Sequence, residues 1–388
     1  MTTTIYHAND AIPEHFATRL LTWFEQYGRH DLPWQFHHRQ TADIYAVWLS
    51  EIMLQQTQVA TVLGYFERFL EQFPTVQALA AAQWQQIAPL WAGLGYYARV
   101  RNLHAGAKQV VQFIKEHGDF PQSVEQWQEV KGVGRSTAGA IVAMGVRGFG
   151  VICDGNVKRV LTRHRKIAGD INKSTTDKKL WQLAEALTPK QDSGKYAQAM
   201  MDLGATICTR TKPKCQLCPI SADCLAYATD SQLDYPVKTK PKPKPHRHSI
   251  VLRLSFQSQV LWLHRQNGGG IWDGLWCLPL LHLPYQADEP LSDNFANYAM
   301  QAWHEQSGLD GGMLGEIVDM PDCPPSRIIR HTLTHFHWHL YRLDVHIDAE
   351  KFRQINQMLD AMGLQYQWLV GDKLAKPAAM VKLLHQAS

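Results

Sequence analysis

The chain has 388 residues, 45% of them hydrophobic, and a formal net charge of +4 at neutral pH. This length favours two domains, and the apolar content is ordinary for a globular protein. No apolar run approaches the roughly 20 residues that a membrane-spanning helix needs, which argues against a membrane protein. The N-terminal stretch MTTTIYHANDAIPEH has neither a basic start nor an apolar core, so we expect no secretory signal and a cytoplasmic protein.

Residues 14–230 are predicted to form a mostly helical domain. Residues 44–73 carry apolar side chains at helical spacing, and strand-like alternation is scarce in this region. Similar helical patterns recur in residues 124–130, 136–146, 155–164, 178–187 and 196–208.

The composition changes after this helical region. Lysine alternates with proline in residues 240–245, and repeated proline blocks both helix and sheet hydrogen bonding. We therefore predict a basic, extended linker over residues 231–248. Strand-like alternation then appears in residues 249–265, 275–281 and 331–347. Residues 249–388 are accordingly predicted to form a smaller α+β domain.

Four of the seven cysteines lie within seventeen residues, with the spacing C-x6-C-x2-C-x5-C. They are Cys208, Cys215, Cys218 and Cys224. Four thiolates at such short spacing hold either a zinc ion or an iron–sulfur cluster, and the spacing alone does not choose between them. The others, Cys153, Cys277 and Cys323, are predicted to be small core residues.

Gly132-Val133-Gly134 predicts a tight turn that opens a helix. The stretch matches neither nucleotide fingerprint, because it lacks the Gly-Lys-Ser/Thr end of a Walker loop and has Thr137 where the dinucleotide pattern needs a third glycine. Glycines allow close backbone approach, and a helix start offers N–H groups to an anion. We interpret the turn as a helix-hairpin-helix that binds a DNA phosphate, with an ordinary connecting turn as the alternative. Basic residues crowd positions 158–166, which favours a nucleic-acid partner.

Several long strings carry a resemblance to a known family. GVGRSTAGAI, DGNVKRV and the four-cysteine loop resemble the endonuclease III superfamily of helix-hairpin-helix DNA glycosylases. Within it, LPW, WLSEIMLQQTQVATV, GLGYYARVRNL, QAMMDLGATICT and KPKCQLCP resemble the MutY family of adenine DNA glycosylases, across residues 16–228. The resemblance implies a [4Fe–4S] cluster on the four cysteines. It also implies base-excision repair in which adenine mispaired with 8-oxoguanine (or guanine) is removed from double-stranded DNA.

Two carboxylates are the candidate catalytic groups, since cleaving an N-glycosidic bond requires a protonated leaving base and a counter-charge for the sugar cation. Glu51 lies in an apolar helical stretch that would raise its pKa, with an exposed helical glutamate as the alternative. Asp154 is suited to cap the following helix. The resemblance makes Glu51 the acid that protonates adenine at N7, Asp154 the stabiliser of the oxocarbenium-like sugar, and Asn156 its assistant.

The resemblance assigns further positions to DNA or base binding. They are Trp34, Gln35, Gln55, Gln56, Thr57, Tyr96, Gly132, Gly134, Ser136 and Gln198. The polar run 55–57 would act where the flipped base leaves the duplex, and Tyr96 would stack beside the damaged partner base; a surface helix and a core aromatic are the alternatives. Ser136 stands where strand-cleaving members of the superfamily carry a Schiff-base lysine, which predicts base excision without efficient β-lyase activity.

Residues 249–388 resemble, more weakly, the Nudix-related C-terminal domain of the same family, chiefly through GGGIWDGLWCLP. Gln301 and Ala302 stand where a working Nudix box needs Arg-Glu, and Gln306 replaces a glutamate. Too few oxygen ligands remain for magnesium. The domain is therefore predicted to recognise the lesion and not to hydrolyse nucleotides.

Leu333-Thr334-His335 aligns with the Phe-Ser-His loop that inspects 8-oxoguanine in the family, so Thr334 and His335 are assigned to lesion binding. His331, His335, His337 and His339 are expected to share one face of a regular strand, where a metal site is the less favoured alternative.

Three rival functions remain: a glycosylase acting on thymine or uracil, a non-catalytic DNA-damage binder, and a nucleotide-pyrophosphate hydrolase. The presence of both Glu51 and Asp154 argues against a pure binder, and the incomplete Nudix box argues against the hydrolase. The favoured interpretation is a monomeric, monofunctional adenine DNA glycosylase, associated with the nucleoid if the source is bacterial.

Overall fold

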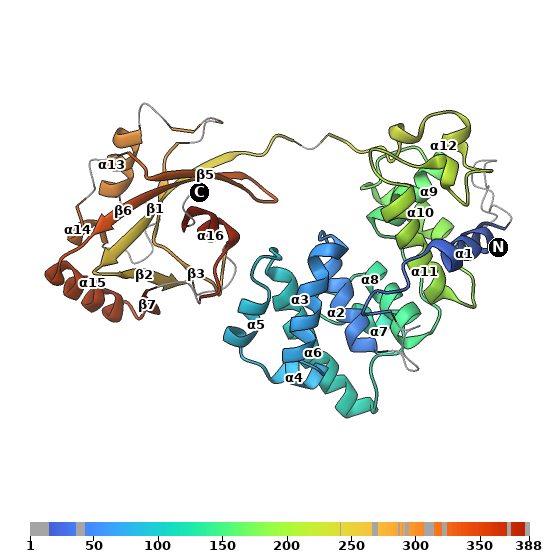
Figure 1. Ribbon diagram of the computed structural model, residues 1–388, viewed down its shortest axis with the longest axis horizontal. Helices are drawn as coiled ribbons and strands as arrows, with labels where there is room; N and C mark the ends of the chain where they lie inside the picture. Colours follow the sequence, from blue (N-terminus) through green and yellow to red (C-terminus); the bar gives the residue numbers. More distant parts are fainter. Residues whose placement is uncertain are drawn as a thin grey trace. The chain divides into compact units, whose positions relative to one another are not determined.

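The computed structural model describes residues 15–35, 43–240, 242–265, 271–285, 288, 290–291, 295–305, 314–319, 324–370 and 374–384. Its contacts divide the chain into two compact units, Met1–Ala82 with Ala98–Lys240, and Gln83–Tyr97 with Pro241–Ser388. Figure 1 shows that helices build the first unit and that the second contains a sheet. The predicted combination of a helical region and an α+β domain is confirmed.

The described residues of the first unit form helices and the loops that connect them. Its helices are α1 (Phe16–Tyr27), α2 (Ile44–Leu54), α3 (Val59–Gln72), α4 (Val76–Ala81), α6 (Ala98–His117), α7 (Val124–Gln128), α8 (Arg135–Ala140), α9 (Gly155–Arg165), α10 (Ser174–Leu187), α11 (Ser193–Asp202) and α12 (Leu225–Ala228). Helix α8 continues into the π-helical turn Ile141–Val146, and α11 into Leu203–Ile207. Such wide turns often accompany functional sites, and here they extend the helices that carry Ser136 and Gln198.

Helix α2 runs through the core of this unit. Its sequence IYAVWLSEIML is apolar on every side, and such a helix is stable only when protein surrounds it. Asp43 caps the N-terminus by accepting a first-turn N–H at 3.0 Å. The buried Arg99 caps the C-terminus by donating to the carbonyls of Ile52 and Met53 at 3.1 and 2.8 Å. Both ends of the helix that carries Glu51 are thus fixed.

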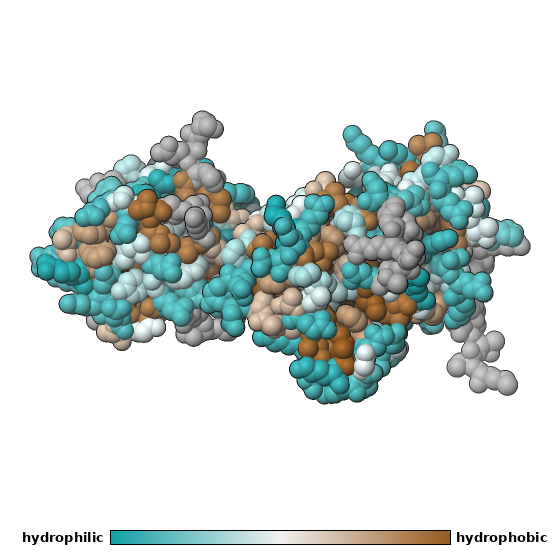
Figure 2. All heavy atoms as spheres, turned by 60° about the horizontal axis from the view of Figure 1, so that its bottom comes forward, coloured by the Kyte–Doolittle hydropathy of each residue, from teal (hydrophilic) through white to brown (hydrophobic). Residues whose placement is uncertain are grey.

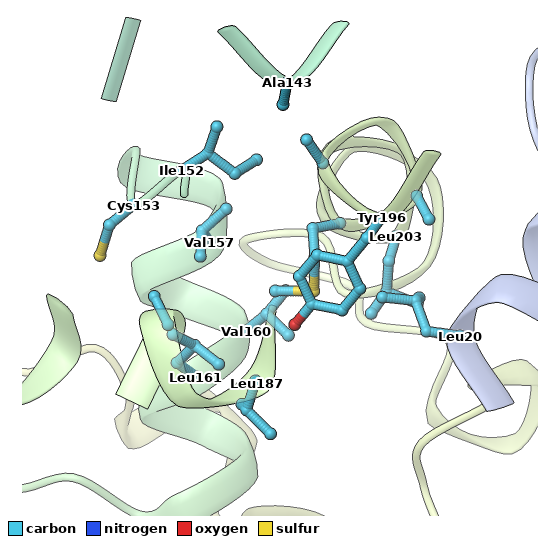
Figure 3. Close-up of a cluster of buried hydrophobic side chains, with 14 of the residues drawn as sticks. Leu20, Ala143, Ile152, Cys153, Val157, Val160, Leu161, Leu187, Tyr196 and Leu203 are labelled. Atoms are coloured by element: carbon cyan, nitrogen blue, oxygen red, sulfur yellow. The ribbon is translucent and has the colours of Figure 1, made fainter. Parts of the chain in front are cut away.

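A second apolar cluster lies where α1, α9, α10 and α11 meet. Figure 3 shows its side chains converging, among them Leu20 of α1, Val160 of α9, Leu187 of α10 and Tyr196 of α11. All four are buried. Burying a large apolar side chain contributes about 1.5–3 kcal/mol, so this cluster fixes α9, whose N-cap is Asp154.

Among the described residues, the second unit forms a seven-stranded sheet with helices. Its elements are α5 (Trp84–Leu90), β1 (His246–Phe256), β2 (Gln259–His264), β3 (Trp276–Cys277), β4 (Leu280–Leu283), α13 (Phe295–Glu305), α14 (Leu314–Ile317), β5 (Arg327–Thr332), β6 (His337–His346), α15 (Ala349–Ala361), β7 (Tyr366–Leu369) and α16 (Ala378–Leu384). The strand order is β3-β2-β1-β6-β5, with β4 also pairing β1 and β7 also pairing β2. Strands β1 and β6 run parallel, and the remaining pairs are antiparallel.

Alternating side chains of β1 separate two apolar layers. Ile250 and Leu252 belong to a core shared with α13 and α15. Val251 belongs to a second core, shared with α16. This period of two is the pattern that predicted the strand.

Residues 83–97 belong to the sheet unit, although they lie inside the predicted helical stretch of the sequence. Trp84 Nε1 donates to the Gly274 carbonyl at 2.7 Å, and Ala88 packs with Leu275 and Ala375. The sequence placed these residues within the helical region 14–230 and gave no sign of their packing partner. At the other junction, β1 begins at His246, within the segment predicted as linker.

The surface is chemically mixed. On the face drawn in Figure 2, hydrophilic residues lie between separate hydrophobic patches. Two large aromatic side chains are well exposed, Tyr27 at 70% and Tyr96 at 51%. None of the helices in the described parts of the chain is long and apolar enough to cross a membrane.

Candidate active site and cysteine centre

The structure brings the two candidate carboxyl groups close together. Glu51 is the only charged residue of α2, flanked by the buried Ser50 and Ile52, and its own side chain is partly exposed. Burial, and secondly the negative charge of Asp154, raise the pKa of Glu51 to about 8. A glutamate with this pKa keeps its proton at neutral pH and can act as a general acid.

Asp154 is the N-cap of α9, as its residue type predicted. Its Oδ1 accepts the N–H groups of Asn156 and Val157 at 3.0 and 2.8 Å. Burial raises the pKa of Asp154, and the two N–H donors oppose that rise. Donors of this kind stabilise the ionised carboxylate, whereas no such donors oppose the rise at Glu51.

Helix α8 packs directly on the segment that leads to Asp154. Ser136 Oγ accepts the backbone N–H of Cys153 at 3.0 Å. A Cβ on Gly139 would lie 1.9 Å from the carbonyl oxygen of Val151, so the two backbones touch at this point. The contact fixes α8 relative to Asp154 and places Ser136 beside the carboxyl pair.

Asn156 is connected to the cysteine loop through Arg159. Arg159 Nη2 donates to Asn156 Oδ1 at 2.9 Å and to the Gly204 carbonyl at 2.7 Å. Its Nε donates to the Cys208 carbonyl at 2.8 Å. The guanidinium therefore orients the Asn156 amide and anchors the first cysteine of the loop at the same time.

The four predicted metal ligands surround one cavity. Cys208, Cys215, Cys218 and Cys224 line one small cavity of about 20 Å³. Burial raises the pKa of Cys218 to about 12, and the charges of the other three cysteines add to the rise. In the described parts of the chain, no three His, Cys, Asp or Glu side chains converge as the ligands of one metal ion do. Four thiols around one cavity are a donor set that suits an iron–sulfur cluster or a zinc ion.

The interpretation of residues 158–166 as a nucleic-acid surface is wrong for much of the cluster. Arg163 is 2% exposed and His164 is 1% exposed. Arg163 donates to the Thr209 carbonyl at 2.7 Å and to Cys208 Sγ at 3.4 Å. A guanidinium has five N–H donors and can therefore bond several loop carbonyls that have no partner in a helix or strand. The buried charges of this cluster thus stabilise the protein interior.

Three residues predicted for the base pocket border a second cavity. Trp34, Gln35 and Gln198 line a small cavity of about 10 Å³, together with Val47. Val47 lies one helical turn before Glu51 on α2, and therefore on the same face. The cavity thus lies beside the candidate acid and combines apolar walls with amide groups, and it would have to widen to admit a planar base.

A buried carboxylate orients this pocket. Gln198 Nε2 donates to Asp202 Oδ1 at 2.8 Å, and Asp202 is 1% exposed. Arg29 pairs with the same carboxylate, with Nη2 at 2.5 Å from Oδ1. Gln35 Nε2 donates to the Arg29 carbonyl at 2.6 Å. Both pocket amides are therefore held by one network around Asp202.

The polar run 55–57 forms the break between α2 and α3. Gln56 is exposed and has a left-handed backbone, with a φ of +60°. Arg99 donates to the Gln55 carbonyl in addition to the end of α2, and the Thr57 N–H bonds the Leu54 carbonyl at 3.2 Å. The break is an ordered turn with an exposed amide.

The predicted glycine turn joins α7 to α8. Gly132 has a φ of +84°, and a Cβ there would lie 2.6 Å from the Cβ of Asn102. Gly134 is the N-cap of α8, and a Cβ there would meet nothing within 4 Å. Only the first position requires glycine, and the second leaves the helix start open.

Tyr96 belongs to the other unit.

Thr334 and His335 are exposed in the turn between β5 and β6. The turn is closed by the Leu333 N–H, which donates to the Phe336 carbonyl at 2.9 Å. The expectation that four histidines share one face of a regular strand is wrong, because this turn separates His331 from the strand that follows.

His339 instead joins two histidines of β1. His246 Nδ1 lies 2.9 Å from His339 Nε2, and the rings of His248 and His339 stack at 4.4 Å. Parallel pairing of β1 with β6 creates this cluster, and no local sequence pattern predicts which strands pair.

Other predicted positions have simpler outcomes. Cys153 and Cys277 are buried core residues, as expected. Both Gln301 and Ala302 belong to α13. Ala302 is buried in the apolar layer, and Gln301 is exposed. Cys323 and Gln306 lie outside the described residues.

Sequence reasoning missed the residues that hold the site together, namely Arg29, Arg159, Arg163 and Asp202. Asp202 stands in the apolar helical string YAQAMMDLGA, the signal that singled out Glu51, and could have been found. The arginines could not, because their partners are loop carbonyls far away in the sequence.

The chain also matches known protein families and individual proteins. Residues 49–186 match the model of the HhH-GPD superfamily of base excision DNA repair proteins, and residues 251–386 match that of the NUDIX domain. The chain is 37% identical over 282 residues to the adenine DNA glycosylase of Buchnera aphidicola subsp. Schizaphis graminum, which covers 73% of this chain and 79% of that protein. It is 43% identical over 228 residues to the human adenine DNA glycosylase, which covers 57% of this chain and 41% of that protein. A solved thermostable thymine-DNA glycosylase aligns with 55% of this chain and 95% of its own, at 26% identity and a TM-score of 0.48.

Proposed function

This chain belongs to the adenine DNA glycosylases, within the HhH-GPD superfamily of base excision DNA repair proteins, and we propose that it removes adenine mispaired with 8-oxoguanine or guanine from double-stranded DNA. The observation that carries the proposal is the pair Glu51 and Asp154. One carboxyl keeps a proton at neutral pH, and the other caps a helix beside it. A reaction that needs an acid and an anion together is served by this pair.

In the proposed reaction, adenine leaves the duplex and enters the cavity lined by Trp34, Gln35 and Gln198. Glu51 donates its proton to adenine N7, which makes the base a better leaving group. Asp154 balances the positive charge that grows on the sugar. Both of its N–H donors bond Oδ1, so Oδ2 is the oxygen that would face the sugar.

Asn156 assists Asp154, and water completes the hydrolysis. Arg159 holds the amide of Asn156 in place. Ser136 lies beside Asp154 and has a hydroxyl that cannot form a Schiff base, which supports a monofunctional glycosylase without efficient β-lyase activity.

We propose DNA contacts at two kinds of position, namely the open start of α8 and polar or aromatic side chains outside the core. Gly132 and Gly134 would admit a backbone phosphate to the start of α8. Gln55, Gln56 and Thr57 would act at the vacated base position, and Tyr96 beside the damaged partner. We expect the protein to act as a monomer, in the compartment that contains the DNA.

Cys208, Cys215, Cys218 and Cys224 are proposed to hold a [4Fe–4S] cluster. Such a cluster would supply four metal–thiolate links that fold the loop, and Arg163 and Arg159 would join that loop to α9. The four thiols around one cavity can hold such a cluster, and the resemblance of the loop to the endonuclease III superfamily supports this assignment over a single zinc ion.

The second unit is proposed to recognise the lesion through Thr334 and His335. Both side chains are exposed in a closed turn, which suits inspection of a partner. Magnesium-dependent hydrolysis is not proposed, because Gln301 and Ala302 supply no carboxylate where a Nudix box requires one.

Glu51→Gln tests the proposal. The variant should bind an adenine:8-oxoguanine duplex as the wild type does and lose base excision, because the amide keeps the shape and has no proton to give. Glu67→Gln on the exposed face of α3 is the matched control and should excise normally. Near-normal turnover by Glu51→Gln would remove Glu51 from the mechanism, and release from G:T or G:U duplexes in place of adenine would favour the thymine or uracil rival.

A further inference from the structure

The turn between β5 and β6 has an exposed tip and two anchored ends. Thr334 and His335 form the tip, and both are exposed. Leu333 and Phe336 flank them and pack in the apolar layer that is shared with α16. The Arg247 guanidinium covers the Phe336 ring, with its Cζ 4.2 Å from the ring centroid. Because the tip lies outside the core, its conformation depends on how the two ends of the turn are held.

The end of the lysine–proline segment is bonded to both ends of this turn. Lys244 Nζ donates to the Leu333 carbonyl at 2.8 Å. On the other side of the tip, the Pro245 carbonyl accepts the His337 N–H at 2.9 Å. Residues that were predicted to form a linker therefore hold the turn on either side of Thr334 and its neighbour.

These bonds fix the peptide planes next to the tip. The Leu333 carbonyl and the Thr334 N–H belong to one planar peptide group, so the bond from Lys244 also sets the direction of the Thr334 N–H. The Phe336 carbonyl accepts the Leu333 N–H at 2.9 Å, and it shares its plane with the His337 N–H. Two of these three bonds join backbone groups, and the third depends on the Lys244 side chain. A substitution at Lys244 can therefore remove that bond alone.

Lys244 differs from the lysines that precede it. It is half-buried, whereas Lys240 and Lys242 are exposed. Pro243 and Pro245 stiffen the backbone on either side of it, and the following proline restricts Lys244 to extended conformations. An ionised donor also makes a stronger hydrogen bond than a neutral one. The position is thus suited to hold a carbonyl in place.

We propose that Lys244 is a positioning residue for lesion recognition. By holding the Leu333 carbonyl, it orients Thr334 and His335 before DNA binds, so the turn loses little conformational freedom when it meets the damaged base. This inference rests on the proposed role of the turn in recognising the lesion. Its contacts lie wholly within the sheet unit, so the positioning is separable from base excision in the helical unit.

Single-turnover excision over a range of enzyme concentrations tests the proposal on adenine:8-oxoguanine and adenine:guanine duplexes. Lys244→Met keeps the chain length and loses the ammonium. It should raise the half-saturating enzyme concentration for the 8-oxoguanine duplex about tenfold, as expected when the competent turn falls to a tenth of its population. The saturating rate and the guanine duplex should be unaffected. Lys244→Arg keeps a cationic donor and should behave as the wild type does.

Lys242→Met is the matched control, because it removes the same charge from an exposed position of the same segment. It should leave both duplexes as in the wild type. Equal weakening of both duplexes by Lys244→Met would show a plain charge contact with DNA and would overturn the proposal. A partly unfolded preparation affects both duplexes alike, so the ratio between them stays a valid measure.

Hydrogen exchange followed by mass spectrometry reports on the turn without DNA. Peptides that cover residues 331–338 should exchange about tenfold faster in Lys244→Met, and as in the wild type in Lys242→Met. Unchanged exchange in Lys244→Met would overturn the positioning role.

His335→Ala separates the failure of this inference from the failure of the proposed function. If His335→Ala loses the preference for 8-oxoguanine and Lys244→Met keeps it, Lys244 does not position the turn for recognition. If both variants keep the preference, the turn does not recognise the lesion, and the proposed role of the sheet unit fails with the inference. Loss of the preference in both variants, with faster exchange in Lys244→Met, is the result that we expect.

Discussion

At Glu51 and Asp154, surroundings give two similar carboxyl groups different properties. Glu51 stands in a helix whose neighbours are apolar, and burial disfavours its ionised form with no backbone N–H donor to offset that cost. Asp154 meets two backbone N–H groups at a helix N-terminus, which compensate its charge. The first surrounding suits an acid and the second suits an anion, which is how one site can protonate a base and stabilise a cation.

This contrast predicts the pH dependence of excision. The pKa of Glu51 is raised to about 8, so the proton-donating form is present below that pH and is lost above it. The single-turnover rate should therefore fall about tenfold per pH unit in the alkaline range. Glu51→Gln should be slow and lack this fall, and Glu67→Gln should keep it. A wild-type rate that stays flat well above the pKa would contradict an acid role for Glu51.

At the scale of elements, backbone contact between α8 and residues 148–153 positions the site. Gly139 and Gly150 allow it, because a Cβ on either would lie 1.9 or 2.0 Å from a carbonyl oxygen of the other segment. The sequence string GVGRSTAGAI was informative for its turn, and the second role of its glycines became visible only in the packed structure.

Gly139→Ala should therefore separate α8 from the segment that carries Asp154. We expect a loss of about 3 kcal/mol of unfolding free energy, since the clash is with backbone that cannot rotate away. Gly64→Ala is the control: in α3 its nearest neighbour is Arg68 Nη1 at 3.9 Å, and alanine there should stabilise the helix by about 0.5–1 kcal/mol. Chemical denaturation measures both. Equal effects of the two substitutions would show that the contact does not constrain the fold.

The pair of β1 and β6 buries His339 against His246 and His248. Burial, and then the charges of neighbouring basic groups, lower the pKa of His339 to about 4. A histidine that is neutral when folded contributes stability above its unfolded pKa of about 6.5, and this is lost as the pH falls toward the folded value. The sheet unit should thus lose roughly 2–3 kcal/mol between these pH values.

Urea unfolding across that pH range tests this prediction. His339→Leu should flatten the acid sensitivity, because no proton can be taken up at that position. His304→Gln, at an exposed position of α13, should leave it as in the wild type. Wild-type stability that is constant over the range would rule out a buried neutral His339.

At the scale of the whole molecule, the chain passes between its two units three times, after residues 82, 97 and 240. The lysine–proline segment is therefore not the only connection. Trp84 and Tyr97 bond the carbonyls of Gly274 and Lys376 at 2.7 and 3.4 Å, so a segment of the N-terminal half is part of the sheet unit.

Cutting the linker should then leave the two fragments associated. A specific protease site placed after Lys240 would give fragments that elute together in size-exclusion chromatography. Trp84→Ala should promote their separation, and Tyr27→Ala, at a residue 70% exposed in the helical unit, should not. Immediate separation of the wild-type fragments would show that residues 83–97 do not hold the sheet unit.

Sequence reasoning succeeded where chemistry is local and failed where it depends on pairing. Cysteine spacing, the apolar surroundings of Glu51 and the capping tendency of Asp154 are all visible within a few residues. The bond from Arg159 to Gly204, the histidine cluster of β1 and β6, and the membership of residues 83–97 each join distant parts of the chain. Periodicity reports which face is buried and does not identify the partner.

The most direct test of the account is single-turnover excision on a duplex with one adenine opposite 8-oxoguanine. The wild type is compared with Asp154→Asn. Each reaction is divided into two halves, and only one half is treated with alkali. The account predicts strand breaks only after alkali in the wild type and none in the variant, because Asp154 supports base loss and Ser136 cannot form a Schiff base. Strand cleavage without alkali, or undiminished excision by Asp154→Asn, would contradict it.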